Sequence, residues 1–363
     1  MASNNVDPQE IDNIIAIAAK QVNLVGHKFM VRSQRIRFAR WNMIVASKFA
    51  KGFNYYASAY FCRNGIELLH DSLWCEDTFD LCRGLHEGAA SALLFLEDSS
   101  EAQQYANALI DNLPFADSLA AQNILLRSWE RMGKYEEQVA RGLAILRGLN
   151  FDIPLQPTPA FIMGAMAQTA GIASKYNLEE IARLRSGKTD VRKKNILQIV
   201  DSMVTGAFRA SSPFLPLITC AVVNYSLQNG VYEESALSFA CLGYFKIALV
   251  GDYKEGRYWI NAAAQILSKG GTNPCTTRAR IVLFGFVQWY FASMRETSFS
   301  LLGTNKVAVA MGDVESAIYS MMFSLRFSFF AGENLSLLNN SYCELLRSMV
   351  SPSVILLRRF LPR

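Results

Sequence analysis

The sequence contains few of the histidines that metalloproteins commonly use to bind metal ions. It has only three histidines, His27, His70 and His86, in 363 residues. The closest approaches to metal-ligand spacing, Glu67-x-x-His70 and Cys82-x-x-x-His86, each lack the second matching pair that a zinc site requires. We therefore expect these side chains to lie on helix surfaces or in the core, and predict no metal and no cofactor.

Motifs for phosphate binding and for nucleophilic catalysis are missing as well. The segment Ser186-Gly187-Lys188-Thr189 ends like a phosphate-binding loop, but it lacks the first glycine and a preceding apolar strand. No G-x-S-x-G pattern marks a catalytic serine. The chain by itself is predicted not to be an enzyme.

Signals for export, disulfides and membrane insertion are absent. The seven cysteines form no C-x-x-C pair and are odd in number, so a disulfide framework is not expected. Residues 1–7 contain no basic segment followed by an apolar run. The longest stretch without charge, 210–232, is broken by Pro213 and Pro216 and is too polar to predict a membrane span. A reducing, cytoplasmic location is the expectation.

Alternation of apolar and polar residues is missing too, and apolar residues recur at i, i+3, i+4 and i+7 instead. A glycine turn opens several of these helical segments, at residues 52, 133, 230, 251 and 312, where we expect the glycine to take the left-handed conformation that ends the preceding helix. After three of the turns, a small residue stands at offsets 3 and 10 of the inward-facing stripe, as in Gly256 and Ala263 after Tyr253. Such positions let a neighbouring helix approach closely. The sequence predicts an all-α fold, an α-solenoid of stacked antiparallel helix pairs of a degenerate tetratricopeptide-like type.

Proline marks the main interruption of this pattern. Three prolines in six positions, Pro154, Pro157 and Pro159, stop a helix and predict an extended connector. We expect an N-terminal helical layer over 1–150, the connector at 151–160, a C-terminal layer over 161–350 and a short tail at 351–363. The basic segment Arg183–Lys194 is predicted to be a solvated loop.

Charge is distributed unevenly along the chain. No acidic residue occurs from 13 to 66, where nine lysines and arginines stand, while the whole chain carries a net charge of only +5. The candidate docking patch comprises Lys28, Arg32, Arg35, Arg37, Arg40, Lys48 and Lys51. A nucleic acid, an anionic membrane surface, an acidic protein domain or solvent alone could face such a patch. Most aromatic residues there have helical spacing and are expected in the core, so a protein domain is favoured and nucleic acid is not.

The same region carries a resemblance to a known family. Residues 11–69, with Arg37-Phe38-Ala39-Arg40-Trp41-Asn42 and Gly65-Ile66-Glu67-Leu68-Leu69, resemble the region after the ATPase module in large predicted-ATPase sensor kinases. These proteins fuse a serine/threonine kinase domain, an AAA-type STAND ATPase, a helical-repeat region, a GAF domain and a histidine kinase. Segments 125–149, 208–216, 243–267 and 331–335 are similar to the same family in the same order, so the resemblance covers about residues 11–340.

The resemblance implies a role in signal transduction. The kinase loops, the phosphate-binding loop and the histidine box of the family have no counterpart in this chain. The chain is therefore expected to be a non-catalytic scaffold that relays signals in a two-component or serine/threonine kinase sensor, binding ATPase or kinase domains in cis or in trans, or an effector. Two alternatives remain: a truncated piece of an ATP-dependent sensor kinase, and a stand-alone adaptor or nucleic-acid binder that uses the basic N-terminal helices.

Overall fold

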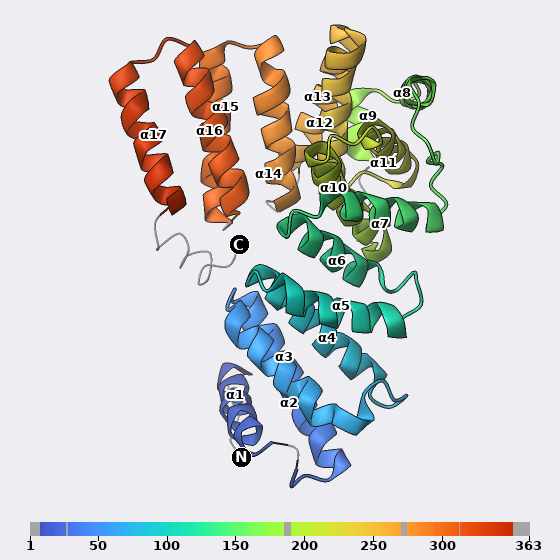
Figure 1. Ribbon diagram of the computed structural model, residues 1–363, viewed down its shortest axis with the longest axis vertical. Coiled ribbons are helices and arrows are strands. Elements are labelled where there is room, and N and C mark those ends of the chain that lie inside the picture. Colours follow the sequence, from blue (N-terminus) through green and yellow to red (C-terminus); the bar gives the residue numbers. More distant parts are fainter. Residues whose placement is uncertain (1–7, 27, 185–189, 270–273, 312, 351–363) are drawn as a thin grey trace, which may run out of the picture. The chain divides into compact units, whose positions relative to one another are not determined.

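The protein is all-helical. The computed structural model describes residues 8–26, 28–184, 190–269, 274–311 and 313–350. Within these ranges the chain forms 17 α-helices and no strand, and the helices stack on their neighbours as an α-solenoid (Figure 1). The predicted fold class is confirmed.

The helices divide between two compact units that meet in the sequence between Met132 and Gly133. Unit 1 contains α1 (Pro8–Val25), α2 (Arg32–Lys51), α3 (Tyr55–Leu69), α4 (Phe79–Phe95), α5 (Ser99–Asn112) and α6 (Leu119–Arg131). Unit 2 contains α7 (Tyr135–Gly148), α8 (Pro159–Ala173), α9 (Leu178–Arg183), α10 (Val191–Arg209), α11 (Leu215–Asn229), α12 (Ala236–Phe245), α13 (Tyr253–Lys269), α14 (Pro274–Ile281), α15 (Met294–Ala310), α16 (Val314–Phe330) and α17 (Leu335–Val350). The proline-rich connector lies inside unit 2, where it is irregular up to the start of α8 at Pro159.

Unit 1 is held together by small buried residues and by one buried amide pair. A Cβ atom on Gly65 of α3 would lie 2.7 Å from Leu85 Cδ2 of α4, so a larger residue there would require the Leu85 side chain to move. The side-chain amides of Asn23 on α1 and fully buried Asn42 on α2 donate to each other at 2.8 and 2.9 Å. These reciprocal bonds satisfy the buried polar groups and fix α1 against α2.

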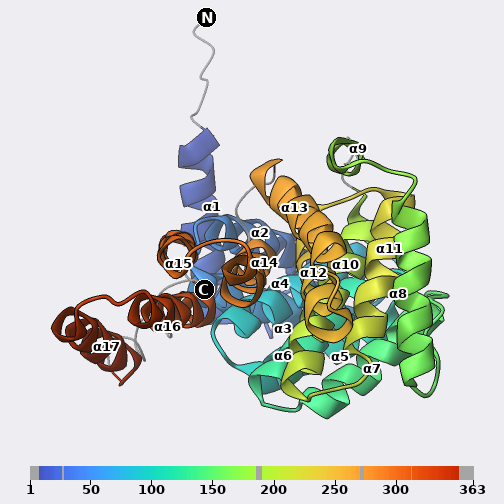
Figure 2. The same cartoon turned by 90° about the horizontal axis from the view of Figure 1, so that it is seen from above.

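In unit 2, small residues bring paired helices together in the same way. A Cβ atom on Gly256 of α13 would lie 3.1 Å from the carbonyl oxygen of Gly243 on α12 and 2.4 Å from Ile247 Cγ1. Between α15 and α16, the Ser298 hydroxyl lies 2.8 Å from the hydroxyls of both Ser324 and Ser328. Figure 2, seen from above, shows α15, α16 and α17 as successive neighbours.

The glycine turns behave as the sequence predicts at three positions. Gly133, Gly230 and Gly251 have φ angles of 73°, 102° and 76°, a region that side chains with a Cβ atom rarely enter. At the fourth turn the prediction is wrong, because Gly52 has φ −86° and Phe53 takes the left-handed conformation with φ 60°. The fifth turn glycine, at 312, lies outside the described residues.

Several other sequence expectations need correction. The inward stripe predicted for α13 begins at Tyr253, yet this side chain is 53% exposed, whereas Gly256, Ile260, Ala263 and Leu267 are buried. The solvated loop predicted at 183–194 is shorter, because α9 ends at Arg183 and α10 begins at Val191. Four aromatic residues of the basic region are exposed and not in the core: Phe29, Phe53, Tyr56 and Tyr60. The tail at 351–363 lies outside the described residues.

Candidate functional site

Unit 2 contains a pocket of about 290 Å³ whose lining is almost entirely apolar and aromatic; we call it the aromatic pocket. Four groups of helices supply its walls: the end of α10, the start of α11 with α12, α14 with the π-helical segment η4 (Val282–Val287), and the first half of α16. Its principal lining residues are Val204, Phe208, Arg209, Leu237, Cys241, Tyr244, Arg278, Phe286, Glu315, Tyr319 and Phe323. The lining spans 120 positions of the sequence, from 204 to 323, so only the stacking of the helices assembles it.

Phe286 is the centre of the aromatic lining. Its ring makes edge-to-face contacts with three other rings, at centroid distances of 5.9 Å to Phe208, 5.8 Å to Tyr244 and 5.3 Å to Phe323. Phe286 belongs to η4, where the wider π turn changes the direction of the side chains relative to α14. Segments of this kind are frequent at functional sites. The same turn brings Val282 and Phe286 to the wall of the pocket.

Arg209 forms the polar edge of the pocket. Its guanidinium group pairs with the Glu315 carboxylate of α16, and donates hydrogen bonds of 2.8 Å to the Tyr135 hydroxyl and 3.2 Å to the Tyr319 hydroxyl. The guanidinium carbon also lies 5.4 Å from the ring centre of Tyr135 and 5.8 Å from that of Tyr319, within the range of cation–π attraction. Arg209 is therefore held by three helices, α7, α10 and α16.

A second arginine, Arg278 of α14, also lines the pocket. Its Nη1 donates a 2.8 Å hydrogen bond to the carboxylate of Asp201, whose side chain is fully buried. The two arginines and two carboxylates near the pocket are therefore charge-balanced.

The one thiol in the lining is a poor candidate for chemistry. Cys241 is buried, and burial raises its pKa to about 12, so the sulfur stays protonated at neutral pH. Because the thiolate is the nucleophilic form, Cys241 contributes shape and polarisability to the pocket.

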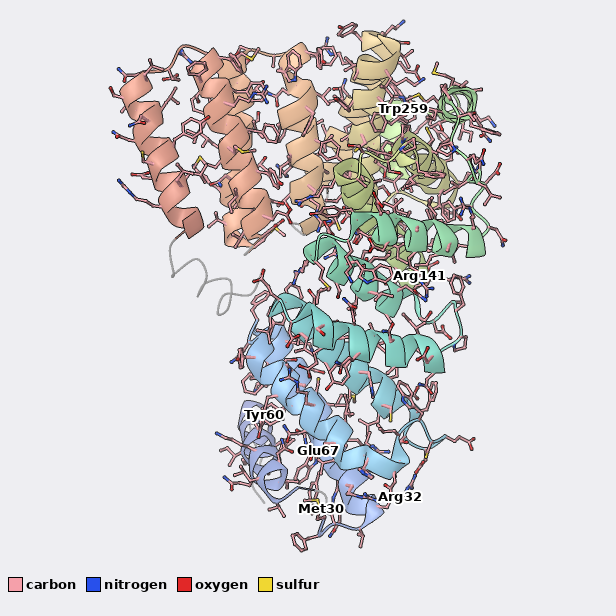
Figure 3. The ribbon with its side chains drawn as sticks, viewed as in Figure 1. Met30, Arg32, Tyr60, Glu67, Arg141 and Trp259 are labelled. Atoms are coloured by element: carbon pink, nitrogen blue, oxygen red, sulfur yellow. The ribbon has the colours of Figure 1, made fainter. Side chains whose placement is uncertain are left out.

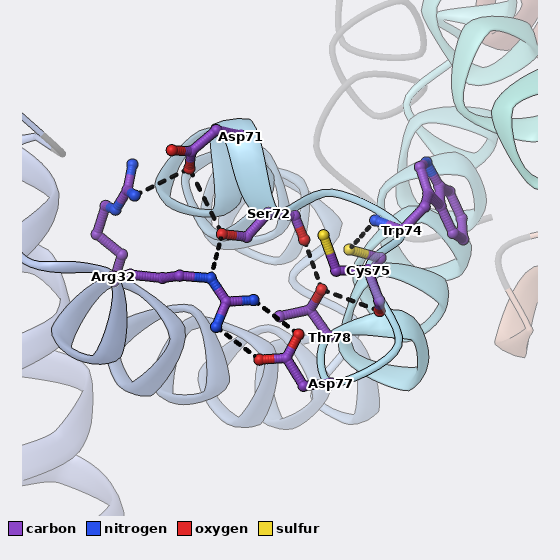
Figure 4. Close-up of polar contacts among 9 residues, drawn as sticks. Arg32, Asp71, Ser72, Trp74, Cys75, Asp77 and Thr78 are labelled. Carbon is purple, nitrogen blue, oxygen red and sulfur yellow. Dashed lines mark hydrogen bonds and ion pairs between the residues drawn. The ribbon is translucent and has the colours of Figure 1, made fainter.

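The basic patch predicted in unit 1 is partly neutralised within the unit. Figure 3 marks Arg32 on α2. Its Nη1 and Nη2 both donate to the Asp77 carboxylate at 2.7 Å, and its Nε donates to the Ser72 hydroxyl at 3.1 Å (Figure 4). Arg35 pairs with Asp71 at 2.9 Å. The hydrogen bond from Arg32 lowers the pKa of Asp77, with a further contribution from the charge of Arg40, and that from Arg35 lowers the pKa of Asp71.

The other members of the patch are exposed. Lys28, Arg37, Arg40, Lys48 and Lys51 all have exposed side chains, and the guanidinium of Arg37 lies 5.5 Å from the Phe38 ring centre. The acids that balance Arg32 and Arg35 come from 36 to 45 positions further along the chain. Exposed positive charge therefore remains before α2 at Lys28, in its first half at Arg37 and at its end at Lys51, less than the acid-free run of the sequence indicates.

Of the two described histidines, His70 is exposed and His86 is part of the packed interior. His86 is buried in unit 1, with Nδ1 2.7 Å from the Cys82 carbonyl oxygen, which makes Nδ1 the protonated ring nitrogen. His27 and Ser186–Thr189 lie outside the described residues. Among the described residues, no group of three or more His, Cys, Asp or Glu side chains is arranged to hold a metal ion.

None of the described helices combines the length and the hydropathy needed to cross a bilayer. All seven cysteines lie in described segments, and none of them forms a disulfide.

Comparison with known proteins identifies no relative: no family model matches the chain, and no curated protein or solved structure is significantly similar to it.

The aromatic pocket was not predicted from the sequence. The only local signal was the succession of aromatic residues on α12, η4 and α16, which cannot be told from core positions until the helices are placed.

Proposed function

We propose that this chain is a helical-repeat scaffold, without catalysis of its own, that relays signals by binding an effector in the aromatic pocket. The observation that carries the proposal is the pocket itself, where walls from α10, α12, η4 and α16 converge and an ion pair joins α10 to α16. A molecule that enters changes the spacing of these helices. In stacked repeats, such a change is passed on through neighbouring contacts.

The resemblance of residues 11–340 to sensor kinases supports a place for the scaffold in an ATPase-coupled two-component or serine/threonine kinase system. Its protein partners are then ATPase or kinase domains, in the same polypeptide or in another one, and it works in the cytoplasm. The exposed part of the basic patch, at Lys28, Arg37 and Lys51, supplies a surface for an acidic face of such a domain.

An antibody raised against this chain tests the proposal in lysate of the source cells. A band several times heavier than 40.5 kDa, with kinase or ATPase peptides in the same band, supports partners in cis. A band near 40.5 kDa that co-precipitates kinase or ATPase domains supports partners in trans. A 40.5 kDa protein that co-precipitates neither contradicts the role in kinase signalling. In both supportive cases, neutralising Lys28, Arg37 and Lys51 together is expected to weaken the association, most clearly at low salt.

A further inference from the structure

The size of the aromatic pocket limits what it can hold. A volume of about 290 Å³ corresponds to roughly ten water-sized volumes, so a ligand of about ten non-hydrogen atoms would fill it. Apolar cavities of this kind are poor sites for ordered water. The rings of Phe208, Phe286 and Phe323 offer contact to an aliphatic or aromatic body.

The polar edge of the pocket determines the head group. The guanidinium of Arg209 has five N–H groups, and its bonds to Tyr135, Tyr319 and Glu315 use three of them. Two remain for an acceptor on a ligand. A positively charged head group cannot use them, because guanidinium N–H groups only donate.

Of the three partners of Arg209, Glu315 is the most exposed, and it is the one that a ligand carboxylate would replace. The Glu315 side chain is 53% exposed, so its carboxylate can turn to water at little cost, whereas Arg209 is 28% exposed and stays clamped between two tyrosines. Ion pairs with such exposure contribute little to stability. A carboxylate on a ligand can therefore take the place of Glu315 on Arg209.

We propose that the aromatic pocket binds a monoanionic amphiphile of about ten non-hydrogen atoms, with its apolar body against Phe286 and its carboxylate on Arg209 in place of Glu315. This proposal rests on the proposed function and names the chemical class of its effector. Binding removes the ion pair between α10 and α16 and leaves the Arg209–Tyr319 hydrogen bond as the direct polar contact between these two helices. The effector thus changes how the last helices of unit 2 are held.

The test uses the full chain and two probes of equal length, octanoate and 1-octanol, with binding measured by isothermal titration calorimetry at about pH 7.5. Octanoate is expected to bind saturably with a Kd below about 1 mM, and at least about tenfold more tightly than octanol. Equal affinities for the two probes, or no saturable binding of octanoate, would overturn the proposal.

Variants at the polar edge sharpen the test. Arg209→Gln should weaken octanoate binding about tenfold and leave octanol binding unchanged. Arg295→Gln is the matched control, because it removes the same charge from the exposed Arg295–Glu333 pair of unit 2 and should change neither affinity. Glu315→Gln should strengthen octanoate binding several-fold, since the competing carboxylate is gone. Weaker octanoate binding in Glu315→Gln contradicts the displacement of Glu315.

Two controls separate this proposal from the proposed function. Thermal melting of each variant shows that it is folded, and Val204→Phe, which fills the pocket with a larger apolar side chain, should abolish binding of both probes. If octanoate fails while the chain still co-precipitates kinase or ATPase domains, only the ligand class is wrong. If the chain co-precipitates neither kinase nor ATPase domains while octanoate binds as expected, the ligand proposal is supported and the role in kinase signalling is contradicted.

Discussion

Asp201 on α10 and Arg278 on α14 are joined by a 2.8 Å hydrogen bond across 77 positions of the sequence, and the Asp201 carboxylate is completely shielded from solvent. The pair forms part of the support beneath the aromatic pocket, because Arg278 lines its wall. A buried charge that loses its partner costs far more than an exposed one.

Removing the charge of Asp201 should therefore destabilise the protein. We expect Asp201→Asn to lower the free energy of unfolding by about 3 kcal/mol, because Arg278 keeps a charge that is only 22% exposed. Urea unfolding followed by circular dichroism measures the change. The control is Glu333→Gln in the exposed Arg295–Glu333 pair, which should cost less than about 1 kcal/mol. Similar losses in both variants would contradict the argument from burial.

The close approach of α12 and α13 at Gly256 gives a second prediction. Gly256→Ala should destabilise unit 2 by about 1–3 kcal/mol, since the new Cβ atom would lie 2.4 Å from Ile247 Cγ1. Gly303→Ala is the matched control: Gly303 lies within α15, is exposed, and has no atom within 4 Å of the place its new methyl group would take. That substitution should raise the unfolding free energy by about 0.5–1 kcal/mol. Thermal and urea unfolding of the two variants should thus shift in opposite directions.

The buried His86 predicts a pH dependence of stability. Burial lowers its pKa in the folded state, whereas in the unfolded chain the pKa is about 6.5. The unfolded state therefore binds the proton first, and the stability contributed by neutral His86, complete above about pH 6.5, declines as the pH falls toward the folded-state pKa. The melting temperature should drop more between about pH 7.5 and 5.5 in the wild type than in His86→Gln. Parallel pH profiles would show that another group is responsible.

Asp71 and Asp77 neutralise part of the basic patch. Removing their charges should therefore strengthen the binding of a polyanion. Asp71→Asn with Asp77→Asn frees Arg35 and Arg32, so the double variant should elute from a heparin column at higher salt than the wild type. Glu136→Gln with Glu137→Gln on α7 makes the same change in net charge away from the patch. An equal shift for both double variants would mean that heparin senses net charge and not the patch.

Local features of this fold could be predicted from the sequence. Helical periodicity and the small residues at Gly65, Gly256 and Ala263 depend on spacings within one helix, and the structure buries all three. Tyr253 differs because it stands in the first turn of its helix, where its ring contacts Tyr290 at a centroid distance of 5.8 Å but stays largely exposed. Phe53 could not be predicted because the left-handed residue of that turn is one position past the glycine.

The candidate sites depend on contacts that no local pattern reveals. A count of charges between 13 and 66 finds no acid, yet Asp71 and Asp77 return to Arg35 and Arg32 through the turn after α3. Arg209 and Glu315 are 106 positions apart, and nothing in either helix alone indicates the partner. The sequence therefore predicts the helices and their stacking. It does not predict the pocket, because the pocket depends on which helices are neighbours in the folded chain.

The contacts of Arg209 with α16 also affect the order in which the helices of unit 2 unfold. In a stack whose repeats touch only their neighbours, terminal hairpins can open one at a time, each with a small free energy. Arg209 ties α10 directly to α16, so α15 and α16 cannot peel away without breaking a contact with the middle of the unit. Under a pulling force applied at the end of α17, α17 should therefore detach first, and α16 should follow only after the contacts of Arg209 with Glu315 and Tyr319 break.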